Sequence, residues 1–451
     1  MNSLYLRGNV KLNILRFGVA SFLLLSIYNV EAAEFGPKTE GEEQVAVKAT
    51  KIESSEHKFA RFDYAGPPLL LAIPVLDPGI PEDPADYEKK EVWPELRKAE
   101  SVRSALKLRS TLLKTNLFSD VIVVPDTSVS ADLFLLGSIG KSNGEEFELT
   151  VELYDTTGEL WMRKTKFKVR TNEEWIMNPS LIDLDPFGDV YVDAAEAVAK
   201  VIVIEGKKHT KIAKKNKKYI EKGRDDKVRM SDINKVIMIR ELLFARSLAP
   251  DIYGETVITK KGKWKLAYMP LTDDTEWERV QAVKAADNRF QEYSMANYES
   301  LTEQIDEPYS IWQRDAFPIA RDARLARNAA NAQLAIGIFA ALAGAAAAAD
   351  GSHSSGARTA GAIAAAAGLA SVATSFKTRA EFKQQASLLD ELGNSVQGVI
   401  APKIIEMRGR QVELVGTAQE QTAQWRSLLK EIYEDTSVDP GAIDIIVVGQ
   451  D

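Results

Sequence analysis

The sequence contains no cysteine among its 451 residues, and this absence removes several classes of protein at once. No disulfide framework can form, and no lipid can be attached to an amino-terminal cysteine. Histidine is almost as scarce, because the chain has only His57, His209 and His353. None of the three stands beside another histidine or a paired carboxylate at the spacing of metal ligands. We therefore expect neither a zinc site nor histidine-based catalysis.

The chain also lacks an excess of positive charge. It carries 57 basic and 65 acidic residues, which give a formal net charge of -8 and a pI near 5.4. Proteins that bind nucleic acid through charge have the opposite balance, so nucleic acid is not an expected partner. Hydrophobic residues make up 45% of the chain and charged residues 27%, which is ordinary for a globular protein, and the length allows two or three folding units.

The first 32 residues have the pattern of a secretory signal peptide. A positive amino-terminal region precedes the apolar run Phe17–Val30, which is too short for a comfortable membrane span. Small residues follow this run and predict cleavage after Ala32 or Ala33, with an uncleaved anchor as the alternative. An exported chain of this size without disulfides fits the bacterial periplasm, including association with the outer membrane, better than a eukaryotic secretory route.

An Ala/Gly-rich block over Ala332–Phe376 is the most distinctive feature of the chain. Its glycines stand seven residues apart within each of two apolar stretches, at Gly337, Gly344, Gly351, Gly361 and Gly368. Side chains seven residues apart share one helix face, so each stretch presents a smooth stripe that another backbone can approach closely. A polar, Gly-rich turn at 350–356 separates the two stretches. The block is therefore predicted to form an antiparallel helical hairpin.

Three environments remain open for this hairpin. Each arm is about 17 residues long and rich in alanine, so insertion into a bilayer would be marginal. Basic residues flank both arms at the same end, and in an inner membrane that end should face the cytoplasm, which conflicts with prior export. The hairpin is expected to pack on its own long helices, to insert or self-associate at an outer membrane, or to span the inner membrane against that rule.

Residues 66–205 show the pattern of an α+β domain. The expected elements are strands at Leu69–Val75, Val121–Val124 and Asp132–Gly140, helices at Ala99–Thr115 and Asp185–Glu205, and a hairpin formed by Phe147–Leu153 and Trp161–Val169. Strict alternation of apolar residues supports the hairpin, which is predicted to turn at Thr157-Gly158. We describe the order as β-α-β-β-β-α, a sandwich of one sheet with helices on one side.

Three short strings in this domain carry a resemblance to known proteins. They are Ala131-Asp-Leu-Phe-Leu-Leu-Gly137, Asn143-Gly144-Glu145, and Leu153-Tyr-Asp-Thr-Thr-Gly158 followed by Trp161. This segment resembles the small periplasmic domain at the amino terminus of the Tol-system propeller protein and in outer-membrane assembly proteins of curli, polysaccharide and flagellar systems. The resemblance implies a fold rather than a catalytic site. The lipobox cysteine usual in that family is absent here, so anchoring would need another route.

The other segments are predicted to be mainly helical. The chain is divided into a signal peptide (1–32), a flexible lead-in (33–65), the α+β domain (66–205), a basic segment with a small hairpin and long helices (206–331), the Ala/Gly hairpin (332–376), and a carboxyl-terminal helix, strand and helix (377–451). In the last segment, Thr417 is expected to be the N-cap of the final helix, with Glu420 three residues on.

A run of lysines opens the 206–331 segment. Its members are Lys207, Lys208, Lys211, Lys214, Lys215, Lys217 and Lys218. Such a run is either a solvated helix face or a contact for an anionic surface such as lipid headgroups. The sequence leaves both interpretations open.

No cofactor or metal is expected. Gly140-Lys141-Ser142 is similar to the end of a phosphate-binding loop, but Leu135 stands where that loop needs a glycine. Asp183 and Asp185 match the first positions of a calcium loop, yet Ala194 replaces its bidentate glutamate. Carboxylates at the start of a helix explain the same aspartates without any metal.

These patterns predict a non-enzymatic exported cell-envelope protein, a structural or assembly component associated with the outer membrane. The Ala/Gly hairpin would serve oligomerisation or membrane contact, with envelope proteins or further copies of the chain as partners. The alternative is a soluble periplasmic binding module that recognises an envelope partner or polymer, with the hairpin as a packed spacer. A hydrolase with a dispersed site has no positive signal in the sequence.

Overall fold

The computed structural model describes residues 59, 62–178, 184–270, 275–328, 387–391, 403–407, 410–435 and 444–447. The predicted signal peptide, most of the lead-in and the whole Ala/Gly block lie outside these residues. So do the five glycines of the predicted hairpin: Gly337, Gly344, Gly351, Gly361 and Gly368. What the sequence predicts for them stays a prediction.

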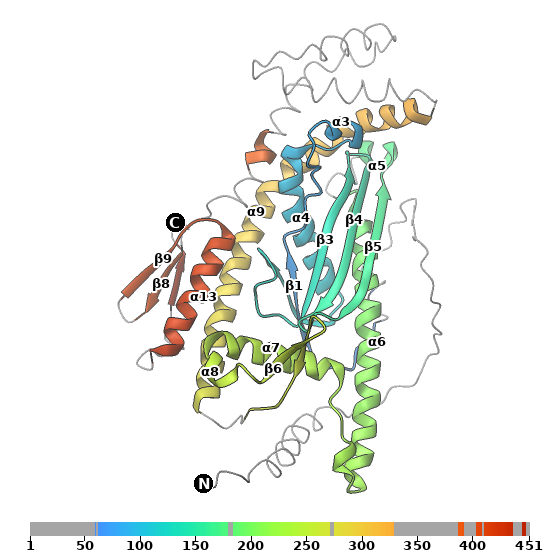
Figure 1. Cartoon of the computed structure of the whole chain (residues 1–451). Coiled ribbons are helices and arrows are strands. Elements are labelled where there is room, and N and C mark those ends of the chain that lie inside the picture. The colour runs from blue at the N-terminus through green and yellow to red at the C-terminus, as the bar shows by residue number, and fades with distance from the viewer. Residues whose placement is uncertain are drawn as a thin grey trace, which may run out of the picture.

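A five-stranded sheet forms the centre of the first half of the chain (Figure 1). Its strands are β1 (Leu69–Pro74), β2 (Phe118–Val124), β3 (Leu133–Ser142), β4 (Glu146–Asp155) and β5 (Leu160–Arg170). They lie in the order β2-β1-β3-β4-β5, with β1 parallel to β2 and β3 and with β3, β4 and β5 antiparallel. The α+β class is confirmed. All five strands expected between Leu69 and Val169 are present, so the order β-α-β-β-β-α counts one strand too few.

The alternating pattern of β4 explains which face of the sheet is buried. Phe147, Leu149, Val151 and Leu153 are at most 1% exposed, whereas the residues between them are half-buried or carry charge. Successive side chains of a strand point to opposite faces, so this alternation commits one face to the core. The hairpin predicted from it is confirmed, and Gly158 takes the positive φ of 83° that its turn requires.

Two helices cover that face. Helix α4 (Pro94–Leu113) contacts β2, β1 and β3, helix α6 (Gly188–Glu221) contacts β5 and β4, and the two helices contact each other. Phe187, at the start of α6, stacks on Phe147 of β4 with ring centroids 5.2 Å apart. Small residues such as Ala194 and Ala195 bring α6 close to the sheet. Two short helices, α3 (Asp86–Lys90) and α5 (Glu173–Met177), precede α4 and follow β5.

A second group of elements lies at one end of the sheet. It consists of the 3-10 turn η2 (Asp225–Lys227), α7 (Asp232–Leu248), α8 (Pro250–Tyr253) and the hairpin of β6 (Val257–Lys260) and β7 (Lys263–Leu266). Ser231 caps α7 by accepting a hydrogen bond from the Asn234 backbone N–H. The small hairpin predicted within residues 206–331 is present.

Helix α9 (Thr275–Asn328) is one continuous helix of 54 residues. The sequence predicts long helices in this region, and Pro308 and Pro318 would interrupt them. In the structure both prolines lie inside one helix, so the interruption is absent. A proline inside a helix costs about 3 kcal/mol, and the cost must be met by packing. Tyr309 and Trp312, which follow the first proline, are fully buried against α4, so tertiary contacts hold the helix together there.

The carboxyl-terminal elements pack on the first half of α9. They are β8 (Lys403–Met407), β9 (Arg410–Leu414), α13 (Ala418–Glu434) and β10 (Asp444–Val447), with the three strands in the antiparallel order β10-β8-β9. Thr417 and Glu420 form the predicted capping box. Trp425 is fully buried and stacks on Phe290 of α9 at 4.7 Å. The predicted strand and helix are confirmed, and β8 and β10 complete a sheet that the sequence did not suggest.

Gly144 sits where the turn between β3 and β4 contacts α9. It forms the turn between β3 and β4 with a φ of 89°, and a Cβ at this position would lie 2.7 Å from the Cβ of Ala316 in α9. Asn143 holds the turn by accepting hydrogen bonds from the backbone N–H groups of Glu145 and Glu146. The turn therefore needs glycine both for its conformation and for its contact with α9.

Replacing Gly144 with alanine should lower the free energy of unfolding by about 1–3 kcal/mol, because it adds backbone strain and a clash with α9. Gly188→Ala is the matched control, since Gly188 opens α6 and a Cβ there meets no atom within 4 Å. Urea denaturation of both variants checks the prediction. Equal stability of Gly144→Ala and the wild type would contradict the close contact.

Candidate functional site

The seven lysines of the predicted basic run all lie on the last turns of α6. Each of them is exposed, and α6 extends beyond the end of the sheet to carry them (Figure 1). The helix expected to stop at Glu205 therefore continues through the run to Glu221. Among the described residues, the one ion pair made by these seven lysines joins Lys208 to Glu205, one turn earlier on the same helix.

The opposite side of this helix end is fixed to the chain that follows it. The Asn216 side-chain amide donates to the Arg229 carbonyl at 2.7 Å and accepts from the Arg229 N–H at 3.1 Å. His209 Nδ1 lies 2.8 Å from the Ser231 hydroxyl. We call residues 207–229 the basic arm. Because its inner side is hydrogen-bonded to the returning chain, the arm is held in a fixed position relative to the fold.

The motif residues that carried the resemblance serve the fold. Asp155 accepts hydrogen bonds from the Thr157 N–H and hydroxyl, from the Glu159 N–H and from the Trp161 indole, at 2.6 to 3.0 Å. It thereby locks the turn between β4 and β5. Asp132, which is 1% exposed, accepts from the Leu70 N–H and pairs with Arg240 of α7 at 2.7 Å. Both carboxylates are occupied by structural contacts.

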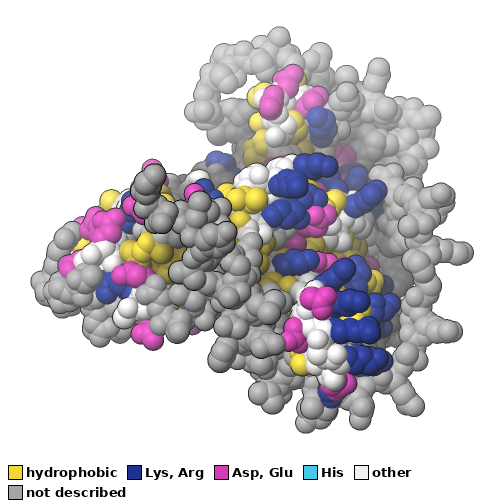
Figure 2. Space-filling model, turned by 60° about the horizontal axis from the view of Figure 1, so that its bottom comes forward, with side chains coloured by type: hydrophobic (Ala, Val, Ile, Leu, Met, Phe, Trp, Pro, Cys, Tyr) yellow, Lys and Arg dark blue, Asp and Glu magenta, His cyan; other side chains and the backbone are white. Residues whose placement is uncertain are grey.

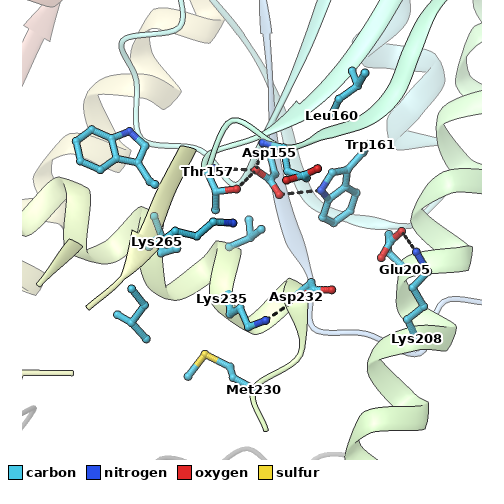
Figure 3. A pocket seen from close by; sticks show the side chains of 15 residues that line it. Asp155, Thr157, Leu160, Trp161, Glu205, Lys208, Met230, Asp232, Lys235 and Lys265 are labelled. Atoms are coloured by element: carbon cyan, nitrogen blue, oxygen red, sulfur yellow. Dashed lines mark hydrogen bonds and ion pairs between the residues drawn. The ribbon is translucent and has the colours of Figure 1, made fainter. Parts of the chain in front are cut away.

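A groove of about 750 Å³ lies between this turn, α6, α7 and β7 (Figure 3). Its apolar lining includes Leu160, Trp161 and Trp264. On α6 the ion pair Glu205–Lys208, and on α7 the ion pair Asp232–Lys235, each place one negative and one positive charge side by side. The groove thus combines aromatic surface with balanced charge, which suits a polar polymer or peptide better than a strongly charged ligand.

A network of ion pairs lies at the boundary between the sheet domain and α9. We call it the charged seam; its residues are Arg97, Glu100, Arg103, Lys107, Glu145, Asp185, Asp306, Tyr309 and Arg324. They come from α4, from the β3–β4 turn, from the segment before α6 and from the second half of α9. The seam therefore joins four parts of the fold.

Two arginines form the ends of the seam. Arg103 of α4 pairs with Asp185 and with Asp306 of α9, both at 2.8 Å, and its guanidinium lies 4.1 Å from the centre of the Tyr309 ring. Burial alone lowers the pKa of Arg103, but the two carboxylates raise it above its ordinary value. Arg324, near the end of α9, pairs with Glu145 through two guanidinium nitrogens, at 2.7 and 2.8 Å.

The middle of the seam contains a fully buried carboxyl group. Glu100 is 0% exposed and accepts hydrogen bonds from the hydroxyls of Ser142 and Tyr309. Burial raises the pKa of Glu100, and the nearby Arg97 offsets this only in part. Arg97 is also fully buried and lies 3.8 Å from Glu100. Breaking such a pair by removing one partner costs about 3–5 kcal/mol, because the other charge is left uncompensated.

A second charged group supports the β3–β4 turn beside the seam. We call it the turn cluster; its residues are Glu91, Lys141, Glu146, Lys168 and Arg170. Glu146 is 2% exposed and pairs with Lys141 at 2.7 Å and with Arg170. Burial alone would raise the pKa of Glu146, but these cations outweigh it and lower the pKa to about 2.

Comparison with family models, with curated proteins and with solved structures finds no match to this chain. The site must therefore be judged on its own chemistry. Within the described residues, no group of three or more His, Asp or Glu side chains is placed to hold a metal ion. In the same part of the chain, no helix has the length and hydrophobicity needed to cross a bilayer.

Sequence reasoning found the basic run but missed the seam. It expected a helix at Ala99–Thr115 and gave its charged residues no role, whereas Arg97 and Arg103 of α4 are buried. The signal that could have exposed this is their spacing. Arg97, Glu100 and Arg103 recur every third residue, which places a row of charges along one side of the helix and within reach of one another.

The turn cluster predicts a pH-dependent loss of stability. Glu146→Gln should lower the free energy of unfolding at pH 7 by about 2–3 kcal/mol, because two half-buried cations, Lys141 and Arg170, lose their buried partner. The folded pKa of about 2 lies below the ordinary value of 4.5, so the stabilisation is complete above pH 4.5 and is lost as the pH falls toward 2. The difference between wild type and variant should shrink over that interval in urea titrations.

Glu299→Gln is the control for this series. Glu299 also pairs with an arginine, Arg109, at 2.7 Å, but its side chain is 53% exposed. Exposed pairs contribute about 0–1 kcal/mol, so this variant should stay close to the wild type at every pH. A Glu146→Gln effect no larger than that of Glu299→Gln would contradict the assigned role of the turn cluster.

Proposed function

We propose that this chain is a non-enzymatic exported component of a bacterial cell envelope, with a structural or assembly role at the outer membrane. In this proposal the Ala/Gly hairpin at 332–376 makes the contact with the membrane or with further copies of the chain. The α+β domain faces envelope proteins. The resemblance of residues 66–205 to small domains of envelope assembly proteins supports this placement.

The observation that carries the proposal is the way α9 leads into the hairpin. Helix α9 ends at Asn328, four residues before the Ala/Gly block begins, and at 1.5 Å per residue it is about 80 Å long. Arg324 and Arg321 attach its last turns to Glu145 and Glu173 of the sheet domain. A hairpin mounted on this helix would be held at a fixed position relative to the sheet. Such a mount suits an assembly component.

The groove favours a second candidate function. A soluble periplasmic binding module would recognise an envelope partner or polymer, and the hairpin would be a packed spacer. Trp161 and Trp264 give the groove the flat aromatic surface on which sugar rings or peptide side chains stack. The two candidates differ in what the hairpin contacts, so its location in cells separates them.

Cell fractionation tests the first candidate. The full chain, expressed in a Gram-negative host, should remain in the outer-membrane fraction after a carbonate wash. Gly344→Leu should reduce this retention or the size of the oligomer, because a large side chain would fill the stripe where backbones approach. Ala346→Leu is the matched control, since it lies two residues away and on the opposite side of a helix.

Release of the wild-type chain into the soluble fraction would favour the binding module. Unchanged oligomer size and unchanged fractionation of Gly344→Leu would contradict the role given to the glycines. Blue native electrophoresis of detergent extracts gives the oligomer size for both variants.

A further inference from the structure

Six of the seven lysines of the basic run form a single stripe along α6, and Lys217 lies outside it. At 100° per residue, Lys207, Lys211, Lys214 and Lys218 fall within an arc of about 60°, and Lys208 and Lys215 extend it on one side. From Lys207 to Lys218 the stripe is about 16 Å long. Figure 2 shows dark blue side chains stacked in a column beside the end of the molecule that projects toward the viewer.

This stripe lowers the stability of the helix that carries it. Lysines three or four residues apart, such as Lys207 and Lys211 or Lys214 and Lys218, are neighbours on the surface, and like charges at this spacing repel. Within the described residues, no carboxylate lies within ion-pair distance of Lys207, Lys211, Lys214 or Lys218. Favourable interaction with the helix dipole helps only the last turn. A solvated face needs no such alignment, whereas an anionic surface would relieve the repulsion.

The arm is mounted firmly enough to act as a contact. Gly206, directly before the stripe, packs so closely on Tyr64 that a Cβ there would lie 2.6 Å from the ring. Asn216 and His209 hold the inner side, as described above. The lysines therefore point outward from a fixed helix, and binding does not require the helix itself to become ordered.

Charge is strongly separated between the arm and the other residues. Residues 207–229 contain eleven basic residues (Lys or Arg) and three acidic residues (Asp or Glu), which give a net charge of +8. Since the whole chain carries -8, the remaining residues carry -16. A negatively charged plane would attract the arm and repel the rest, so the molecule would approach it with the arm first. A nucleic acid does not present an extended charged plane that would attract the arm and repel the remaining residues. The exposed stripe also carries no aromatic side chain for base stacking.

We propose that the lysine stripe docks on the surface of an anionic phospholipid bilayer, through phosphate-bearing headgroups. Lysine suits this partner because its ammonium group is a compact charge on a flexible stem, which needs no fixed geometry of the phosphate. The inference rests on the proposed function, for which it names one partner surface. It also gives the protein two separate contacts, the stripe and the predicted hairpin.

Vesicle co-sedimentation with the full purified chain tests the proposal. The vesicles contain phosphatidylcholine alone or phosphatidylcholine with phosphatidylglycerol in the ratio 7:3, and the readout is the part of binding that depends on phosphatidylglycerol. This part should fall by about tenfold or more in a variant with Lys207, Lys211, Lys214 and Lys218 changed to glutamine. It should also fall steeply between 0.1 and about 0.5 M NaCl, because salt screens exposed charges.

The matched control changes four exposed lysines on other elements to glutamine: Lys90, Lys114, Lys164 and Lys430. It alters net charge by the same amount. Its binding should stay within about twofold of the wild type, since salt screens charges that lie more than a Debye length from the bilayer. Thermal unfolding of both variants shows that each is folded. Equal loss in the two variants, or no dependence on phosphatidylglycerol in the wild type, would overturn the proposal.

Competition identifies a different partner. If a short DNA duplex or heparin retains the wild-type chain while anionic vesicles do not, the stripe recognises another polyanion and the proposal is wrong. Failure here is distinct from failure of the proposed function. Loss of vesicle binding leaves carbonate-resistant retention of the wild type untouched, whereas release by carbonate would overturn the envelope role without changing the effect of the four glutamines on vesicle binding.

Discussion

The charges buried between the sheet domain and α9 must stay paired, and the positions of the surrounding elements depend on this condition. A charge inside a protein loses its hydration and is tolerated only beside a partner at close range. Arg103 therefore holds Asp185 and Asp306 together, and through them the start of α6 and the middle of α9. Glu100 imposes a similar condition on Ser142 and Tyr309. Hydrophobic packing allows many small displacements between helix and sheet, while these pairs allow very few.

Patterns that repeat over short distances made much of the sheet domain predictable. The alternation of β4, the Asp155 turn and the Thr417 capping box are each specified by residues within a few positions of one another, and all were expected from the sequence. The order of the strands in the sheet was not, because β2 and β3 are separated by only eight residues yet lie on opposite sides of β1. No local pattern distinguishes that arrangement from two neighbouring strands.

The seam could not be predicted for a related reason. Whether Arg97 and Arg103 face water or protein depends on Asp306 and Tyr309, which lie some two hundred residues further along the chain. The continuity of α9 through Pro308 and Pro318 likewise depends on partners in α4. The lysine run was visible at once, since charge density is a local property. That the inner side of the lysine-bearing helix is fixed could not be predicted, because it depends on the path of residues 222–231, which only the structure supplies.

Helix α9 also determines the order in which the hydrophobic cores can be completed during synthesis. The sheet core is complete once α6 has been made, apart from contacts that are added later by Ile233 of α7 and by Met295 and Tyr298 of α9. The other core, around Phe290 of α9, stays open until Trp425 and Ile432 emerge more than a hundred residues later. A ribosome adding about 5–20 residues per second leaves that apolar face uncovered for several seconds or more. During this interval a chaperone or a translocation channel has a binding surface on the nascent chain that the folded protein no longer offers.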